Sequence, residues 1–398
     1  MQTPLPRSQS NPLPEPVADA LAHTIACEAL LCAEIAKAGG WLSFARFMEL
    51  ALYAPGVGYY AAGARKFGAD GDFVTAPEIS PLFGQCLAQS IAEVLRQTGG
   101  DVLELGPGSG KLAIDVLRAL DEMGTLPDKY CLLEVSADLR ERQQHALAAL
   151  PPHLATRAVW LDELPKDFVG AVIANEVLDV VPVHLVTYSA GRIFERGVVV
   201  RDGAFAWQGN PALPRELVGP AAQIHDQYLN QSPPDGYLTE VAPAVGGLVK
   251  SLAQSIERGV LIFIDYGFRG AEFYHPSRVA GTLMCHYRHY AHTDPLRYPG
   301  LQDITAHVDF TAVADAGTAA GLELLGYTTQ ANFLLASGLP GLLQRTDPDA
   351  IASYLPLTNQ VHRLVSPAEM GEFFKVIGFA KGLVAPIGAF ETARQLPL

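Results

Sequence analysis

The sequence lacks any apolar run long enough to cross a membrane. A bilayer-spanning helix needs about 18 or more consecutive apolar residues, and the longest apolar strings here, such as residues 260–264, have the length of a strand. Positive charge is also scarce, with 28 Lys and Arg against 42 Asp and Glu and a formal net charge of -14. The missing apolar run predicts no membrane insertion. The excess of negative charge would repel a phosphate backbone, so we expect no nucleic-acid partner.

Cysteine is rare, and its spacing contains no C-x-x-C pair. The chain has five cysteines, which fall mostly within apolar stretches, at Cys27, Cys32, Cys86, Cys131 and Cys285. We interpret them as buried thiols in a reducing compartment. Residues 1–16 are rich in proline and polar residues and lack the apolar core of a secretory signal. We therefore predict a disordered leader at 1–16 and a cytoplasmic location.

The apolar pattern after the leader is that of helices. Residues 17–100 are predicted to form an N-terminal helical cap. Its first helix ends at Gly39-Gly40, and its apolar stripe consists of Val17, Leu21, Ile25, Cys32 and Ile35. A later helix starts at Ser80-Pro81, because serine is a preferred N-cap and proline suits the first helical position.

From residue 101 onward, short apolar runs alternate with helical patterns. Strands are expected at 102–105, 130–135, 171–174 and 260–264, with helices at 111–120 and 137–150. This alternation predicts an α/β fold of right-handed βαβ units with a doubly wound, mostly parallel sheet. We assign the core to 101–184 and 259–398. An inserted substrate or lid segment spans 185–258, and a second lid insertion spans about 268–316.

A glycine-rich loop, ELGPGSG at 104–110, follows the first core strand. A P-loop would need Gly where Leu105 stands and Ser or Thr where Leu112 stands. A dinucleotide loop would need a third Gly at the position of Lys111. The remaining pattern, acid-x-G-x-G-x-G, suits an adenosyl ligand without a pyrophosphate, because its glycines allow close backbone approach while Glu104 can engage an ammonium group. The loop therefore predicts S-adenosylmethionine as the ligand.

Other polar side chains follow later strands, where ligands bind in open α/β sheets. Glu134 is expected to hold the two ribose hydroxyls, or else to be an ordinary acid at the start of the next helix. Asp162 is expected to accept from the adenine amino group, or to lie on the solvated surface. Asn175 and Glu176 directly follow a buried apolar strand, and burial of such groups without partners would be unfavourable, so we predict a role in the site.

Longer strings make the chain resemble a known family. They are YAPGVGYY at 53–60, GDFVTAPEIS at 71–80, the glycine loop, NEVLDVVPV at 175–183, IDYG at 264–267 and HVDFT at 307–311. With these strings the chain resembles the MidA-like family, the bacterial relatives of a mitochondrial complex I assembly-factor arginine methyltransferase. The resemblance runs from about Phe47 to the C-terminal region.

The resemblance implies a class I methyltransferase, Rossmann-like in fold, that uses S-adenosyl-L-methionine and releases S-adenosyl-L-homocysteine. It implies a protein substrate with an acceptor arginine, which in the mitochondrial members belongs to a respiratory complex I subunit. The residues that it places at the cofactor, together with those inferred above, are Thr75, Pro77, Glu104, Gly106, Pro107, Gly108, Gly110, Glu134, Asp162 and Asn175. It places Tyr59 with the substrate or lid. The eukaryotic members carry a mitochondrial address that this leader does not show.

Catalysis of methyl transfer mainly requires alignment of the acceptor and removal of one proton. Glu176 and Asp179 are the expected catalytic residues, since their i, i+3 spacing would let both grip a planar guanidinium. Asp179 could instead be a helix-start acid that interacts with the helix dipole. His307 and Asp309 are assigned to a lid over the acceptor, or to a structural hydrogen-bonded pair.

Three histidines, at positions 286, 289 and 292, recur at three-residue intervals. They suit a lid surface better than a zinc site, which needs convergent geometry and usually a fourth ligand, so no metal is expected. The leading hypothesis is a protein arginine methyltransferase. The alternatives are a small-molecule methyltransferase, a non-catalytic assembly or interaction protein that retains cofactor binding, and an NAD-binding oxidoreductase.

Overall fold

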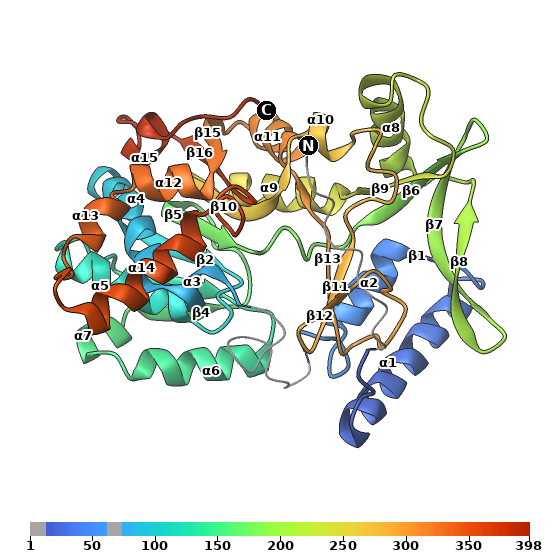
Figure 1. Ribbon diagram of the computed structural model, residues 1–398, viewed down its shortest axis with the longest axis horizontal. Coiled ribbons are helices and arrows are strands. Elements are labelled where there is room, and N and C mark those ends of the chain that lie inside the picture. Colours follow the sequence, from blue (N-terminus) through green and yellow to red (C-terminus); the bar gives the residue numbers. More distant parts are fainter. Residues whose placement is uncertain (1–12, 62–73) are drawn as a thin grey trace.

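A central β-sheet forms the middle of the molecule in the computed structural model, which describes residues 13–61 and 74–398 (Figure 1). Its strands follow the order β15-β16-β10-β5-β2-β3-β4, and the short β14 pairs with the end of β10. Their bounds are β2 Asp101–Leu105, β3 Tyr130–Leu133, β4 Ala158–Leu161, β5 Phe168–Asn175, β10 Ile256–Phe268, β14 Val308–Asp309, β15 Glu323–Thr329 and β16 Phe374–Lys381. Only β16 runs antiparallel to its neighbours. The predicted doubly wound, mostly parallel sheet is therefore confirmed.

The strand order reverses at β2, and this reversal positions the site. The chain passes from β2 outward to β3 and β4, then returns to β5 on the other side of β2. Leu105 is paired with Leu133 on β3 and with Ala174 on β5, so these three strands end at the same edge of the sheet. Ligands of open α/β sheets bind in the crevice outside the carboxyl ends of the strands at such a reversal.

Helices cover both faces of this sheet because successive side chains of each buried strand point to opposite faces. One face carries α4 Pro81–Thr98, α5 Lys111–Glu122, α6 Ala137–Ala148, α7 Pro152–Ala155, α12 Gln330–Ala336, α13 Leu339–Leu343, α14 Ile351–Val365 and α15 Gly388–Thr392. The other face carries α9 Pro243–Ser255 and α11 Phe310–Ala319. As expected, α4 begins at an N-cap, with the Ser80 hydroxyl accepting from the Leu82 N–H at 3.4 Å.

A second, antiparallel sheet lies beside the core and is called here the insert sheet. It has the order β1-β7-β6-β9, with β8 also paired to β7, and its bounds are β1 Leu42–Ser43, β6 His184–Ser189, β7 Arg192–Arg201, β8 Ala204–Asn210 and β9 Tyr237–Val241. On one face pack α1 Ala18–Lys37 and α2 Phe44–Tyr53, and on the other α8 Arg215–Gln223 and the π-helix η1 Ile224–Tyr228. The remaining elements are α3 Ala76–Ile79, α10 Gly270–Phe273, β11 Met284–Tyr287, β12 Tyr290–His292 and β13 Asp303–Thr305.

Packing cuts across the expected domain limits, which remain a proposal. Within 17–100, α1 and α2 pack on the insert sheet whereas α4 packs on the core sheet. Within 185–258, α9 packs under the core sheet. Residues 1–12 of the predicted leader and 71–73 of the GDFVTAPEIS string lie outside the described residues. No helix in the part of the chain that the structure describes is long and apolar enough to span a membrane.

The apolar stripe predicted for α1 is wrong except at Ile35. The helix buries Thr24, Cys27, Leu31 and Ile35. Val17, Leu21 and Ile25 are 64%, 45% and 53% exposed, and Cys32 is also exposed, so it is not the buried thiol we expected. The reason is tertiary, because α2 and β7 contact a different face of this helix from the one that the apolar spacing favoured.

Candidate active site

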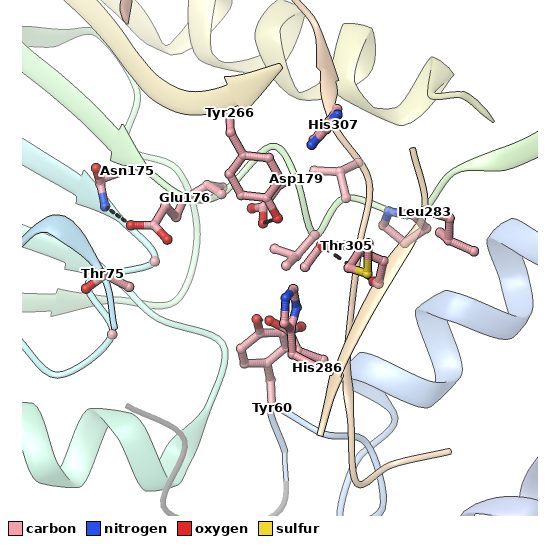
Figure 2. Close-up of a pocket in the computed structure, with 18 of the residues that line it drawn as sticks. Tyr60, Thr75, Asn175, Glu176, Asp179, Tyr266, Leu283, His286, Thr305 and His307 are labelled. Atoms are coloured by element: carbon pink, nitrogen blue, oxygen red, sulfur yellow. Dashed lines mark hydrogen bonds between the residues drawn. The ribbon is translucent and has the colours of Figure 1, made fainter. Parts of the chain in front are cut away.

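A cavity of about 1200 Å³ opens between the carboxyl ends of the core strands and the insert sheet (Figure 2). Its walls come from β2, β3 and β5 on the core side, and from β7, β8, β11 and β13 on the other. It is lined by most of the residues singled out in the sequence, namely Thr75, Pro77, Glu104, Gly106, Pro107, Gly108, Glu134, Asn175, Glu176, Asp179 and His307. Residues up to a few hundred positions apart therefore meet around one space.

The glycine loop turns sharply between β2 and α5. Gly106, Gly108 and Gly110 have φ angles of 59°, 56° and 80°, in the left-handed region that favours glycine. A Cβ on Gly106 would meet Cγ2 of Val177 at 3.0 Å, so the loop lies close against the segment that follows β5. Gly110 does not line the cavity; it is the N-cap residue of α5, and its N–H donates to the Pro107 carbonyl at 2.8 Å.

Glu104 lies one residue before the end of β2, and this residue is 2% exposed. One of its oxygens accepts from the Tyr130 hydroxyl at 2.6 Å. Burial raises the pKa of the Glu104 carboxyl to about 7, against the lowering effect of that hydrogen bond. The group is therefore held close to its titration point at neutral pH.

Glu134 follows β3 and is fixed by a buried amide. Its Oε1 accepts from the Ser136 N–H at 2.8 Å, and its Oε2 accepts from Gln143 Nε2 at 3.0 Å. Gln143 has no exposed surface; its Nε2 also donates to the Gly108 carbonyl at 2.9 Å, and its Oε1 accepts from the Trp160 indole at 2.9 Å. One side chain of α6 thus ties the glycine loop, the acid after β3 and β4 into one rigid unit.

Asn175 and Glu176 leave the end of β5 and point into the cavity (Figure 2). Glu176 has a φ of 53°, unusual for a residue with a side chain, and its N–H donates to the Ile264 carbonyl of β10 at 2.9 Å. Asn175 Nδ2 donates to Glu176 Oε1 at 3.1 Å, while the buried Asn175 Oδ1 has no hydrogen-bond partner in the part of the chain that the structure describes. Burial, and then the neighbouring Asp179, raise the pKa of the Glu176 carboxyl to about 8.

Asp179 is 5% exposed and lies beside Glu176. Its Oδ2 accepts from the Tyr266 hydroxyl at 2.6 Å, whereas its buried Oδ1 has no hydrogen-bond partner in residues 13–61 and 74–398. Burial raises the pKa of this carboxyl above its usual range. An unsatisfied carboxylate oxygen facing a cavity is a site for a donor from a ligand.

Asp265, on β10, shapes the loop that carries Asp179. Its Oδ2 accepts the N–H groups of Val177, Leu178 and Asp179 at 3.2, 2.8 and 3.2 Å, and its Oδ1 accepts the N–H of Tyr266 at 2.9 Å. Asp265 is 1% exposed. This carboxylate therefore acts on the site through the backbone and positions Glu176 and Asp179.

Aromatic side chains and one further acid complete the lining of the cavity. Tyr60 donates to Asp303 Oδ1 at 3.0 Å and stacks on Tyr53 with ring centroids 5.5 Å apart. Asp303, on β13, is 3% exposed and lines the cavity. Tyr266 stacks on Phe373 at 5.5 Å. The middle of the cavity is thus bounded by carboxylates and tyrosine rings.

Besides Gly110, three predicted residues lie outside the cavity. Asp162 has an 87% exposed side chain that pairs with Arg140 at 2.8 Å. Tyr59 is 3% exposed and packs in the core between α2 and the insert sheet. Asp309 caps α11, accepting from the N–H of Thr311 at 3.0 Å, and lines a separate cavity of about 270 Å³. His307 faces the main cavity, and no hydrogen bond between it and Asp309 is observed; burial lowers its pKa to about 4.

The three evenly spaced histidines fall on a hairpin. His286 on β11 lines the cavity, His289 occupies the turn with a φ of 66°, and His292 lies on β12. Within residues 13–61 and 74–398, no group of three or more His, Cys, Asp or Glu side chains is arranged to hold a metal ion.

Several residues of the site were missed in the sequence. Asp265 and Tyr266 lie within the IDYG string, which signalled their importance but not their role. Gln143 and Asp303 had no signal, because an amide within a helix and an acid within a polar insertion read as surface residues until the fold buries them.

Comparisons with known proteins identify the class. The family model described as "Putative S-adenosyl-L-methionine-dependent methyltransferase" matches residues 86–328. The chain belongs to this family. Both the predicted activity, S-adenosylmethionine-dependent methyl transfer, and the predicted cofactor are confirmed.

Individual relatives narrow the resemblance. The mitochondrial protein arginine methyltransferase NDUFAF7 of Danio rerio is 29% identical over 89% of this chain and 89% of its own length. The Drosophila melanogaster homolog is 30% identical over 87% and 83%. A crystal structure from Burkholderia thailandensis, described as a COG1565 superfamily member bound to S-adenosyl-homocysteine, matches with a TM-score of 0.91 at 48% identity, over 96% of this chain and 98% of that one. The resemblance to the MidA-like family is confirmed.

The cytoplasmic location predicted from the leader is corrected by these relatives. The printed names of the Danio rerio and Drosophila melanogaster relatives place them in the mitochondrion, as does that of the human relative, which is 29% identical over 85% of this chain. The prediction rested on the composition of the first sixteen residues, which carries no information about where the family works.

Proposed function

We propose that this methyltransferase modifies an arginine of a protein substrate, with Glu176 and Asp179 as the catalytic residues that hold the guanidinium. The observation that carries the proposal is the pair of neighbouring carboxyl groups in one cavity, with Asp179 Oδ1 lacking a hydrogen-bond partner among the described residues. A planar guanidinium presents several donors in a fixed fork and suits two carboxylates better than any other side chain. The names of the relatives, protein arginine methyltransferases, support the same acceptor.

The residues of the cavity fit the cofactor. The left-handed glycines allow a ligand to approach the backbone, Glu134 is oriented for two hydroxyl groups, and Asn175 Oδ1 is a buried acceptor without a partner. Thr75 and Pro77 line the same part of the cavity, beside the glycine loop. When bound, S-adenosylmethionine supplies an electrophilic methyl group on a sulfonium. We therefore assign the glycine-loop side of the cavity to the donor and the side of Asp179, Tyr266 and Asp303 to the acceptor.

The protein must hold the acceptor and move one proton. Asp179, fixed by the Tyr266 hydroxyl, accepts a guanidinium N–H through its free oxygen. Glu176, in its ionised form, accepts the proton that the nitrogen loses as the new bond forms. The positive guanidinium itself favours the ionised forms of both acids, whose pKa values are raised in its absence. Tyr60 and Tyr266 line the cavity at this place.

Replacement of Glu176 by Gln tests the proposal. The variant should bind S-adenosylhomocysteine within about twofold of the unchanged protein by calorimetry, while transfer of radiolabel to protein arginine falls at least about a hundredfold. Labelling uses an extract of a strain that lacks the gene, followed by hydrolysis to identify the methylated amino acid. Glu257→Gln, at an exposed position on β10, is the matched control and should leave labelling unchanged.

Three results would contradict the assignment. Label confined to small molecules would make the enzyme a small-molecule methyltransferase. Label on a residue other than arginine would show that arginine is not the acceptor. Loss of cofactor binding in Glu176→Gln would show that this acid binds the methyl donor. A complex I subunit as the particular substrate stays a prediction, to be tested by the identity of the labelled polypeptide.

A further inference from the structure

Positive charge in the cavity is confined to the side of the insertions. Four carboxyl groups, those of Glu104, Glu134, Glu176 and Asp179, lie at or just after the ends of core strands, and a fifth, that of Asp303, lies on β13 on the side of the insertions. On the side of the insertions, the cavity is lined by two guanidinium groups, Arg196 and Arg278, and no other Arg or Lys of the described residues lines it. A cavity that served only a cationic acceptor would have no use for these groups, because each would repel it.

Arg196 projects from β7 beside Trp207. Its guanidinium lies 4.4 Å from the centroid of the indole ring, an arrangement that orients its plane without using its N–H donors. Leu185, directly opposite on β6, also lines the cavity, which shows that this face of the insert sheet is its wall. Burial lowers the pKa of Arg196, and no carboxylate of the described residues pairs with it. A half-buried cation without a partner gains stability from a bound anion.

Arg278 is also placed beside an aromatic ring. Its guanidinium lies 4.4 Å from the ring centroid of Phe268, its Nε donates to the backbone carbonyl of Glu272 at 3.4 Å, and no carboxylate of the described residues pairs with it. The ring centroids of Phe268 and His307 are 5.1 Å apart, and those of His307 and Tyr266 are 5.3 Å apart. Tyr266 in turn donates to Asp179. Arg278 and Asp179 therefore stand at opposite ends of one short row of rings.

We propose that Arg196 and Arg278 form a carboxylate-binding subsite for the methyl acceptor, so that the substrate segment carries an acidic side chain near its acceptor arginine. This inference rests on the proposed function, since it places the acid relative to the arginine held by Glu176 and Asp179. The arginine of the substrate would face the carboxyl groups of Glu176 and Asp179, and its acidic side chain would face the two guanidinium groups. Such a dipolar fit sets the register of the peptide and rejects arginines with basic neighbours.

Peptide binding to the enzyme saturated with S-adenosylhomocysteine tests the subsite. The probes are fluorescein-labelled peptides of Gly and Ala with a central Arg and one Glu, whose position is moved along the peptide, each compared with its Gln twin. We expect at least one Glu position to bind about tenfold more tightly than its Gln twin, as a charge-assisted hydrogen bond predicts. In Arg196→Gln or Arg278→Gln this preference should fall to about twofold or less, and Arg196→Lys or Arg278→Lys should restore part of it.

Arg192→Gln is the matched control, since Arg192 lies on the same strand, also beside a ring, but exposed and outside the cavity. It should keep the full preference. The absence of any Glu preference, or its persistence in both Gln variants, overturns the subsite. Weaker binding of S-adenosylhomocysteine by the two variants would also overturn it, because the arginines would then serve the cofactor.

A second set of peptides separates this inference from the function on which it rests. Here the central Arg is replaced by Gln while the Glu is kept. If affinity depends on Glu but not on Arg, the subsite stands and the arginine acceptor fails. If it depends on Arg but not on Glu, the acceptor stands and the subsite fails.

Discussion

Glu176→Gln should change the pH dependence of stability as well as activity. Burial beside Asp179 raises the pKa of the Glu176 carboxyl from 4.5 to about 8. Each unit of difference between the folded and unfolded values corresponds to about 1.4 kcal/mol, so the ionised carboxylate destabilises the fold by roughly 4–5 kcal/mol at most. Glu176 is only partly buried and faces a cavity open to water, so we expect about 1–3 kcal/mol in practice.

The direction follows from proton binding. Between about pH 4.5 and 8 the folded protein keeps a proton on Glu176 that the unfolded chain has lost. Unfolding therefore releases a proton, and stability falls as the pH rises through this window. Glutamine cannot ionise, so the variant should gain stability relative to the unchanged protein as the pH rises, and the gain should level off above about pH 8.

Urea unfolding of the two proteins at several pH values between 5 and 9 measures this difference. We expect the free energy of unfolding of the variant, measured relative to that of the unchanged protein, to increase by about 1–2 kcal/mol from pH 6 to pH 9. A constant difference across the range would refute it, because Glu176 would then titrate alike in both states. In the unchanged enzyme, kcat/KM for the arginine substrate should rise with pH through about 8, since the acceptor needs the ionised acid.

Further predictions concern the cofactor side, each measured by titration with S-adenosylhomocysteine. Glu134→Ala should weaken binding about ten- to a hundredfold, because an oriented carboxylate is lost, whereas Glu141→Ala, at an exposed position of the following helix, should not. Gln143→Ala should weaken binding about tenfold with the fold retained, since it frees both Glu134 and the Gly108 carbonyl; unchanged affinity would show that the amide does not position them. Gly106→Val should abolish binding, because a side chain at this left-handed position collides with Val177, and retained affinity would place the cofactor elsewhere.

Local patterns were sufficient for the core of the fold. Buried strands such as 171–174 and 260–264 are continuous apolar runs, and the strands at 102–105 and 130–135 are followed by helical patterns, so a parallel doubly wound sheet is what the alternation predicts. The glycine loop was equally legible, because its excluded alternatives each fail at a named position, such as Lys111. These features depend on neighbours in the chain, which the sequence displays directly.

The family strings also predicted the class of enzyme and many residues of its site. They mark positions in the chain without requiring the contacts of those residues to be known. They could not assign roles. Asp265 lies in such a string, but that it orders the loop of Asp179 depends on β10 lying beside β5.

The buried face of α1 and the grouping of side chains around the cavity were decided by tertiary structure. The buried face of α1 was chosen by α2 and β7 and differs from the one its apolar spacing favoured. Arg196 and Arg278 share a cavity with the carboxyl groups of the core strands because the inserted segments fold over the carboxyl edge of the core sheet. The sequence by itself determined the sheet, the cofactor loop and the family, since each is encoded in contiguous residues. Only the fold decided which distant side chains share the cavity and which acids lose water, because burial and charge depend on neighbours that the chain brings together from far apart.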